Sequence, residues 1–317
     1  MKIKNLINKK TKKQIIDSKY NPILRFINNI RYLFKYNLKE MYNNPNINIG
    51  KVTELAAIKT KFMWDEIKVP KIKDDLETIS ELVNTNKSII RFGDGEIFLM
   101  LGKNNCFEPA NEKIKNILNE IFYNDIPDLL TGTRYDMFRI NTDFIDYTIG
   151  SYRNVFLLKK YSKIKHLFNY NKTYYSACFI YPYLIYSGWN FDNYFDELRK
   201  IWQDKKLTIV IGNNIFKKIK YNIFDNAKEI SYIFGPNKQA FKQYDSLKEK
   251  VLKAPKDNIL IFILGPCGKI LAYDAFKVGY RVLDLGHLIK NYDFYQRRNE
   301  MTVDEFYQEF TTFCAPD

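Results

Sequence analysis

The last third of the chain alternates short apolar runs with segments of helical periodicity, and this alternation restricts the fold more than any other feature. Continuous apolar runs are typical of strands in a parallel sheet that helices cover on both faces. The sequence therefore predicts an α/β fold with a parallel sheet flanked by helices, in which ligands bind outside the carboxyl ends of the strands. The expected strands are Leu207–Ile211, Ile230–Phe234, Ile259–Leu264 and Arg281–Leu285, with helices over about 214–227, 239–252 and 268–278.

The part of the chain before residue 204 is less regular. Regular patterning begins at Val69. We therefore divide the chain into a basic, partly helical N-terminal extension, residues 1–70, and an α/β domain, residues 71–317. The pattern in this part predicts a helix over Asp74–Leu82, a strand over Ser88–Phe92, a helix-like apolar run up to Leu101, and helices over 111–122 and 192–203.

The positive charge of the chain is concentrated near its N-terminus. The whole sequence has 50 Lys and Arg against 36 Asp and Glu, a net charge of +14. Residues 1–40 alone hold 11 basic and 2 acidic residues, a net of +9, so the remainder is close to balanced at +5. A balanced body without a basic stripe or a nucleic-acid-binding motif argues against a nucleic-acid partner.

Part of this basic extension has the spacing of an amphipathic helix. Apolar residues recur at helical intervals over Pro22–Leu38, and Arg25, Arg31 and Lys35 fall on the other face. Such a helix can lie on an anionic membrane surface, which predicts a peripheral contact of residues 1–40 with the inner face of the membrane. The alternative is an ordinary helix that packs on the protein's own core.

Cysteine usage and the N-terminal sequence favour the cytoplasm. Cys106, Cys178, Cys267 and Cys314 are too widely spaced for a metal or redox motif and too few for a disulfide scaffold, so we expect buried free thiols. Lysines interrupt Met1–Lys13, which therefore lacks the apolar region of a signal peptide. The apolar stretches elsewhere fall short of the ~20 residues of a membrane span. We expect a cytoplasmic protein.

The segment Arg91-Phe92-Gly93-Asp94-Gly95-Glu96 places two carboxylates just after an expected strand. If the backbone stays extended, Asp94 and Glu96 can point to the same side, and the glycines leave room for a ligand at the backbone. Carboxylate oxygens suit Mg²⁺ or Mn²⁺, which are commonly held by one or two carboxylates plus substrate phosphates. The segment therefore predicts a site for a metal-bound diphosphate. The alternative is an acidic turn, because Asp-Gly is a common turn dipeptide.

Two later segments also follow expected strands. Gly265-Pro266-Cys267-Gly268-Lys269 opens a helix, where free backbone N–H groups favour a phosphate, although a tight strand-to-helix turn is an equal alternative. Val282–Gly286 mimics the start of a methyltransferase cofactor loop but lacks the glycines that should follow, which makes a Rossmann methyltransferase the rival enzyme. His287 ends this run in a position to touch a ligand, whereas a lone histidine is more often structural.

These segments together resemble the GT-D type glycosyltransferases, a bacterial family first catalogued as a domain of unknown function. The resemblance covers about residues 71–295. The sequence departs from the family where Phe216-Lys217 replaces a Ser-Arg pair, where 218–221 lack glycine, and where Tyr181-Pro182-Tyr183 replaces Arg-Pro-Tyr. The matching segments are Ser88–Met100 with its RFGDGE, Asn222–Lys228, Asn237–Tyr244, Leu264–Pro266, Leu271–Asp274, Gly279-Tyr280 and Asp284–His287.

The resemblance implies a Rossmann-like domain that binds a UDP-sugar. It places the family's D-x-E motif, with its divalent cation Mn²⁺ or Mg²⁺, on Asp94 and Glu96, and it brings His287 near the same cleft. We therefore expect these three residues to be catalytic. Lys217 would replace the family's arginine in part, without its bidentate fork. The expected donor-binding residues are Arg91, Gly93, Gly95, Lys217, Asn222, Gly265 and Pro266.

The chemistry of the residues agrees with what the resemblance implies. Sugar transfer needs a neutralised diphosphate, which a metal on Asp94 and Glu96 would provide, and a base for the acceptor hydroxyl, for which His287 and Asp284 are both candidates. We expect a metal-dependent transferase that moves a hexose from a UDP-sugar to a glycan acceptor, either a surface polysaccharide or a glycoprotein glycan. The rivals are the methyltransferase and, because the arginine and glycines are missing, a non-catalytic nucleotide-sugar-binding module.

Overall fold

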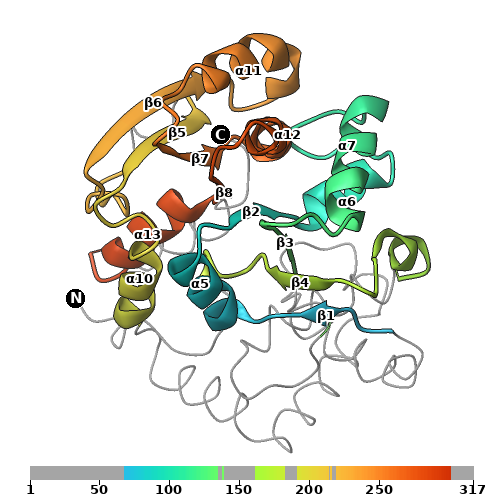
Figure 1. Cartoon of the computed structure of the whole chain (residues 1–317), viewed down its shortest axis with the longest axis horizontal. Helices are drawn as coiled ribbons and strands as arrows, with labels where there is room; N and C mark the ends of the chain where they lie inside the picture. The colour runs from blue at the N-terminus through green and yellow to red at the C-terminus, as the bar shows by residue number, and fades with distance from the viewer. Residues whose placement is uncertain are drawn as a thin grey trace, which may run out of the picture.

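The computed structural model describes residues 68–134, 138, 161–182, 191–213, 215 and 219–300 (Figure 1). The expected helix over Pro22–Leu38, almost all of the extension 1–70, Lys217 and Cys314 lie outside the described residues. Within them, eight strands form a single sheet in which every neighbouring pair is parallel. This arrangement confirms the α/β class that the apolar runs predicted.

The strand order changes direction in the middle of the sheet. The order is β1-β4-β3-β2-β8-β7-β5-β6, so the strands on one side of β2 come from the first half of the domain and those on the other side from the second half. Ligands bind such sheets at the carboxyl ends of the strands where the order reverses, here between β2 and β8. The strands are β1 (Lys71–Ile72), β2 (Ser88–Arg91), β3 (Leu129–Thr133), β4 (Thr173–Ser176), β5 (Lys206–Gly212), β6 (Glu229–Gly235), β7 (Ile259–Ile263) and β8 (Val282–Asp284).

Helices cover both faces of the sheet, as Figure 1 shows. Each face has its own apolar core, and the fully buried Phe122 and Trp202 belong to different cores. Two short 3-10 helices, η4 (Lys165–Leu167) and η6 (Ala240–Gln243), complete the described elements. One face holds α6 (Asp94–Met100), α7 (Glu112–Tyr123), α11 (Tyr244–Leu252) and α12 (Gly265–Lys277), and the other holds α5 (Asp75–Asn84), α10 (Asp192–Arg199) and α13 (Leu288–Arg297).

Strand β7 shows why the apolar runs are continuous. Leu260 and Phe262 enter the core on one face, whereas Ile259, Ile261 and Ile263 enter the core on the other. Because side chains alternate between the faces of a strand, a strand covered on both sides places all of its side chains in the cores, which favours apolar residues at every position. Fully burying one such side chain stabilises the fold by about 1.5–3 kcal/mol.

The helix expected over 214–227 is wrong for the residues described there. Residues 219–228 form turns instead. Asp293 Oδ1 accepts the backbone N–H groups of Lys220 and Tyr221, and Asn222 Oδ1 accepts that of Phe224. Side-chain oxygens that take backbone N–H groups compete with helical hydrogen bonds. This segment therefore joins β5 to β6 without a helix in its described part.

The cysteines follow the expectation only in part. Cys178 and Cys267 are buried free thiols, but Cys106 is exposed. Cys106 lies in the loop between α6 and α7, at the rim of the pocket described below, where no core covers it. Among the described residues, no helix combines the length and the apolar character that crossing a bilayer requires.

Candidate functional site

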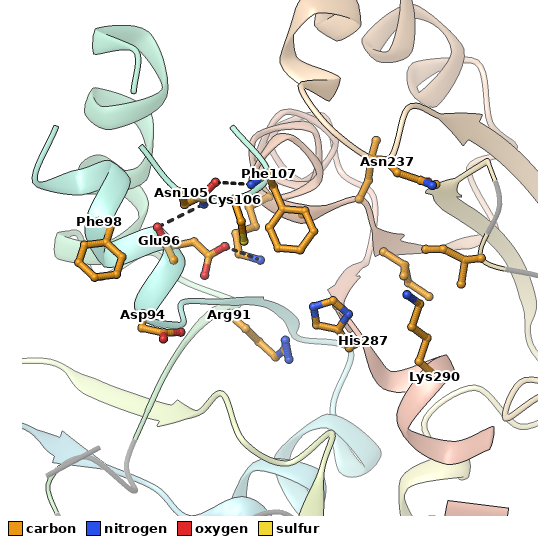
Figure 2. Close-up of a pocket in the computed structure, with 18 of the residues that line it drawn as sticks. Arg91, Asp94, Glu96, Phe98, Asn105, Cys106, Phe107, Asn237, His287 and Lys290 are labelled. Atoms are coloured by element: carbon orange, nitrogen blue, oxygen red, sulfur yellow. Dashed lines mark hydrogen bonds and ion pairs between the residues drawn. The ribbon is translucent and has the colours of Figure 1, made fainter. Parts of the chain in front are cut away.

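A pocket of about 510 Å³ opens at the carboxyl edge of the sheet, where the strand order changes direction. Its lining comes from the ends of β2, β3, β5, β7 and β8 and from the segments that follow them. Figure 2 shows Asp94 and Glu96 on one side of this pocket, Asn237 and Lys290 on the other, and Phe107 and His287 between them. The volume lies within the range of small-molecule sites, about 300–1,000 Å³.

Asp94 and Glu96 both line the pocket, but they do so from the first turn of α6. The backbone is not extended here, because Gly93 is the N-cap residue and the helix begins at Asp94. Glu96 stabilises this early start, since its Oε2 accepts the N–H of Gly93 at 2.8 Å. The two carboxylates therefore differ: the Asp94 side chain is 52% exposed, whereas that of Glu96 is 13% exposed and engaged.

The pocket lining is cationic overall. Arg134, which follows β3, lies with Nη1 3.9 Å from Asp94 Oδ1. Lys269 of α12 lies with Nζ 3.0 Å from Asp284 Oδ2 and 3.5 Å from Glu96 Oε1. A cleft with an excess of positive charge attracts anionic ligands. Beside its two carboxylates the pocket has four cationic side chains, those of Arg91, Arg134, Lys269 and Lys290.

Arg91 is held in a fixed position at the end of β2. Its backbone N–H donates to Asp284 Oδ2 at 2.9 Å, and its Nε donates to the Asp284 carbonyl at 3.0 Å. Its Nη1 also donates to the Ala177 carbonyl at 3.3 Å. A Cβ at Gly286 would lie 2.6 Å from Arg91 Nη2, so the guanidinium occupies space that only a glycine leaves open.

His287 lines the pocket at the N-cap of α13. Burial lowers the pKa of its imidazole to about 4, and the positive charges of Lys290, Arg91 and Lys269 act in the same direction. The imidazole is therefore neutral at physiological pH. A neutral imidazole can accept a proton, which is the state that a general base requires.

The loop between α6 and α7 forms one wall of the pocket. Asn105 Oδ1 accepts the N–H groups of Phe107 and Glu108 at 2.9 and 2.7 Å, which fixes the turn. The Phe107 carbonyl accepts the N–H of Gln239 at 2.8 Å, so the loop is tied to the segment after β6. The Phe107 ring is thereby held 6.1 Å from the His287 ring, centroid to centroid.

The oxygen donors fit a divalent cation that a substrate helps to hold. Asp94 and Glu96 supply two carboxylates in a pocket that otherwise favours anions. Within the described residues, no group of three or more His, Cys, Asp or Glu side chains could hold a metal ion. Mg²⁺ is typically bound by one or two carboxylates together with substrate phosphates. A metal on Asp94 and Glu96 stays a prediction, and a phosphate-bearing ligand would complete the coordination that these two carboxylates begin.

The structure brings together most of the residues that the sequence pointed to. Gly93 caps α6, Pro266 is buried in the first turn of α12, and Asn222 lies in the turns between β5 and β6; none of the three lines the pocket. Lys217 lies outside the described residues. The predicted residues that do line the pocket are Arg91, Asp94, Gly95, Glu96, Gly265 and His287.

Several lining residues were missed by the sequence reasoning. Arg134 follows β3, a short Leu-Leu-Thr-Gly-Thr strand that carries little strand signal. Lys269 was part of the quoted glycine-rich turn, but its partners Glu96 and Asp284 lie far away in the sequence. A cation in the second turn of a helix that follows an apolar strand was the available signal for Lys269.

Comparison with known proteins places the chain among glycosyltransferases. The family model described as "Glycosyltransferase GT-D fold" matches residues 89–310, a range that contains every pocket-lining residue. "Glycosyltransferase GlyD" of Streptococcus pneumoniae serotype 4 is 25% identical over 260 residues, which cover 76% of this chain and 30% of that protein. "Probable glycosyl transferase Gly" of Streptococcus gordonii is 26% identical over 260 residues, which cover 80% of this chain and 36% of that protein. The chain spans about a third of the length of these curated relatives.

Solved structures give the same result. A structure described as a new glycosyltransferase from Streptococcus sanguinis matches with a TM-score of 0.67 and 25% identity, over 74% of this chain and 88% of that one. A domain described as having a distinct glycosyltransferase fold matches with a TM-score of 0.67 and 27% identity, over 76% of this chain and 89% of that one. The likeness therefore extends over nearly the whole of both solved chains.

Proposed function

Because the chain belongs to the GT-D fold glycosyltransferases, we propose that it transfers a hexose from a UDP-sugar to a glycan acceptor. The acceptor is a surface polysaccharide or a glycoprotein glycan, and Mn²⁺ or Mg²⁺ is held by Asp94 and Glu96. The observation that carries the proposal is the pocket between β2 and β8, where four cations and two carboxylates line one cavity. A diphosphate with its metal ion is the ligand that needs both kinds of group.

The family match confirms the glycosyltransferase class that the sequence predicted. It leaves the methyltransferase interpretation of Val282–Gly286 without support. The carboxylate of Asp284 in that segment is 2.9 Å from the backbone nitrogen of Arg91 and 3.0 Å from Lys269 Nζ. Asp284 therefore holds other residues of the site in position.

The bond that breaks joins the anomeric carbon of the sugar to a phosphate oxygen, and negative charge develops on the departing UDP. Lys269, Lys290 and the N-terminus of α12, where Gly265 lines the pocket, offset that charge. The divalent cation, when bound, supplies Lewis-acid stabilisation of the same oxygens. Positive groups placed in advance cost little reorganisation during the reaction, and each can contribute about 10²–10³-fold to the rate.

The new bond joins the anomeric carbon to an acceptor hydroxyl oxygen, whose proton goes to His287. The imidazole can accept this proton because burial and the nearby cations keep it neutral, although a pKa of about 4 makes it a weaker base than a group poised near pH 7. Asp284, the other candidate base, does not line the pocket and is paired with Lys269. The structure thus favours His287 over Asp284 in this role.

The proposal also includes a peripheral contact with anionic lipid. Residues 1–40 hold 11 basic and 2 acidic residues, while the rest of the chain is nearly balanced. Basic segments are attracted to anionic membrane surfaces by about 1 kcal/mol per Lys or Arg near the surface. Such a contact would bring the pocket to acceptors that grow at the membrane.

The test is incubation of the full chain with a panel of radiolabelled UDP-sugars and Mn²⁺, comparing wild type with Asp94→Ala. Loss of one oxygen ligand should lower donor turnover by about 10²-fold or more. Asp196→Ala serves as the control, because Asp196 is an exposed carboxylate on α10 that does not line the pocket. Its turnover should equal that of the wild type.

The other results each contradict a part of the proposal. Equal donor turnover and UDP binding by Asp94→Ala and wild type would exclude the metal role of Asp94. UDP binding without hydrolysis or transfer across many donors and acceptors would indicate the non-catalytic binding module. If calorimetry shows binding of S-adenosylmethionine and no binding of UDP, the methyltransferase interpretation would be supported instead.

A further inference from the structure

Four charged side chains, those of Arg91, Glu96, Lys269 and Asp284, form a cluster at the pocket, which we call the buried charge cluster; all but Asp284 line the pocket. Arg91, Lys269 and Asp284 are 8%, 5% and 2% exposed. The cluster holds two cations and two carboxylates, so its charges balance. Buried charges are tolerated when they are paired, and removing one partner leaves the other uncompensated.

The pairs within the cluster are unequal. Asp284 has two close partners, the backbone N–H of Arg91 at 2.9 Å and Lys269 Nζ at 3.0 Å. Glu96 Oε1 lies 3.5 Å from Lys269 Nζ, a longer distance than that of a good charge-assisted hydrogen bond. The other oxygen of Glu96 is taken by the Gly93 N–H. The contact between Lys269 and Glu96 is therefore the weakest link in the cluster.

Lys269 and Glu96 also both line the pocket, whereas Asp284 does not. An anion that enters the pocket meets Lys269, and a cation that enters meets Glu96. The lysine ammonium group has three donors on a flexible stem and can shift between acceptors without moving the backbone. Each ligand thus competes for one member of the pair.

We infer that Lys269 is the counter-ion of Glu96 when no substrate is bound, and that it leaves Glu96 to pair with the diphosphate of the donor. When the diphosphate binds, Lys269 pairs with its oxygens, and Glu96 is released to ligate the divalent cation. This inference rests on the proposed function, because it assigns the order in which the charges of that site are satisfied. It explains why Glu96, one of the two carboxylates expected to bind the metal ion, lies beside a lysine.

The exchange predicts effects of opposite sign for the two ligands. Lys269→Met should weaken the binding of UDP alone, because the diphosphate loses a cation, and strengthen the binding of Mn²⁺ alone, because Glu96 loses its competitor. Glu96→Gln should do the reverse, since glutamine can still accept the Gly93 N–H while leaving Lys269 unpaired on that side. A residue that only stabilised the fold would weaken both ligands together.

The experiment is titration calorimetry of the full chain with MnCl₂ alone and with UDP alone. Lys206→Met is the matched control: Lys206 also forms a lysine–aspartate pair, with Asp257 at 2.9 Å, but at the amino end of β5. A second control, Lys269→Met combined with Asp94→Asn, tests whether the added Mn²⁺ affinity belongs to the D-x-E pair. Without that control, an ion in the space between Glu96 and Asp284 could give the same gain.

We expect Lys269→Met to lose about tenfold or more in UDP affinity and to gain at least about threefold in Mn²⁺ affinity. The gain should disappear when Asp94→Asn is added, and Lys206→Met should match the wild type for both ligands. An unchanged or reduced Mn²⁺ affinity in folded Lys269→Met, or a gain that survives Asp94→Asn, would overturn the exchange. If Lys269→Met does not fold, Glu96→Gln decides: weaker binding of UDP alone would overturn it.

The failure of the proposed function gives a different result. In that case the wild type binds no UDP, with or without Mn²⁺. The part of the inference that concerns the diphosphate is then contradicted together with the proposed function. The Mn²⁺ titrations of Lys269→Met still show whether Lys269 competes with the metal ion for Glu96.

Discussion

The imidazole of His287 lies at the start of α13, beside Phe107 and among the cations of the pocket. Burial, together with the positive charges of Lys290, Arg91 and Lys269, lowers its pKa from an ordinary value of 6.5 to about 4. The unfolded chain takes up a proton between about pH 6.5 and pH 4, whereas the folded chain does not. The stability that depends on the neutral imidazole is therefore present above pH 6.5, the pKa of the imidazole in the unfolded chain. It is lost as the pH falls toward about 4, the pKa in the folded chain.

This pH dependence of stability leads to a prediction for His287→Gln, which removes the titrating group. The free energy of unfolding should fall less for this variant than for the wild type between about pH 7 and about pH 5. Denaturant unfolding of both proteins at the two pH values measures the difference. His166→Gln is the control, because it removes the only other histidine of the chain without touching the pocket. Equal losses for wild type and His287→Gln would show that the imidazole is not held neutral.

At the residue scale, the sequence revealed those site residues that share a short segment. Asp94 and Glu96 stand two apart beside glycines, and His287 ends an apolar run, so local pattern was enough to find them. The pairing of Lys269 with Glu96 and Asp284, in contrast, is recognisable only from distances that the fold creates. Pairs of this kind are distant in sequence and leave no local pattern.

Among the elements, the turn between β8 and α13 sets the position of Arg91. Gly286 has a φ of 47° there, and a Cβ would lie 2.6 Å from Arg91 Nη2. Gly279, between α12 and β8, has a φ of 92° and nothing within 4 Å of an added Cβ. The two glycines share the left-handed conformation, and only Gly286 also faces a side chain of the site.

Gly286→Ala should therefore lose more stability than Gly279→Ala, in which only the backbone strain of about 1–3 kcal/mol applies. It should also weaken UDP binding, because the Arg91 guanidinium must move, while Gly279→Ala should bind UDP as the wild type does. Thermal unfolding and UDP titration of both variants check this. If the two variants behave alike, Gly286 is needed for its backbone conformation alone.

The elements of the last third were predictable because each buried strand reads as a continuous apolar run with a turn after it. β5, β7 and β8 fall on expected runs, and so does β6, although β6 is a mostly exposed edge strand that includes Ser231. The strands β3 and β4 were not found, since both are short and mix threonine, serine or glycine with apolar residues. The helix expected over 214–227 is absent from its described part, where Asp293 accepts the backbone N–H groups of Lys220 and Tyr221 and Asn222 accepts that of Phe224. A hydrogen-bond acceptor as distant in sequence as Asp293 cannot be predicted from the spacing of apolar residues.

For the whole molecule, the main charge asymmetry separates residues 1–40 from the domain that holds the pocket. With +9 of the net +14 in those residues, deleting them should abolish co-sedimentation with vesicles of anionic lipid and leave UDP affinity unchanged. Vesicles of neutral lipid are the control, and added salt should weaken the binding of the full chain. If the full chain does not bind anionic vesicles, the charge is a solvated surface.

The central claim is that the pocket between β2 and β8 binds the diphosphate of a nucleotide sugar. The most direct measurement is a crystal structure of the full chain with UDP and Mn²⁺. We predict that the diphosphate lies against Lys269 and the N-terminus of α12, with the metal ion on Asp94 and Glu96. A second cavity of about 470 Å³ lies at the amino ends of the strands, lined by residues that include Lys256 and Arg281. UDP bound in that cavity, or anywhere else outside the β2–β8 pocket, would contradict the claim.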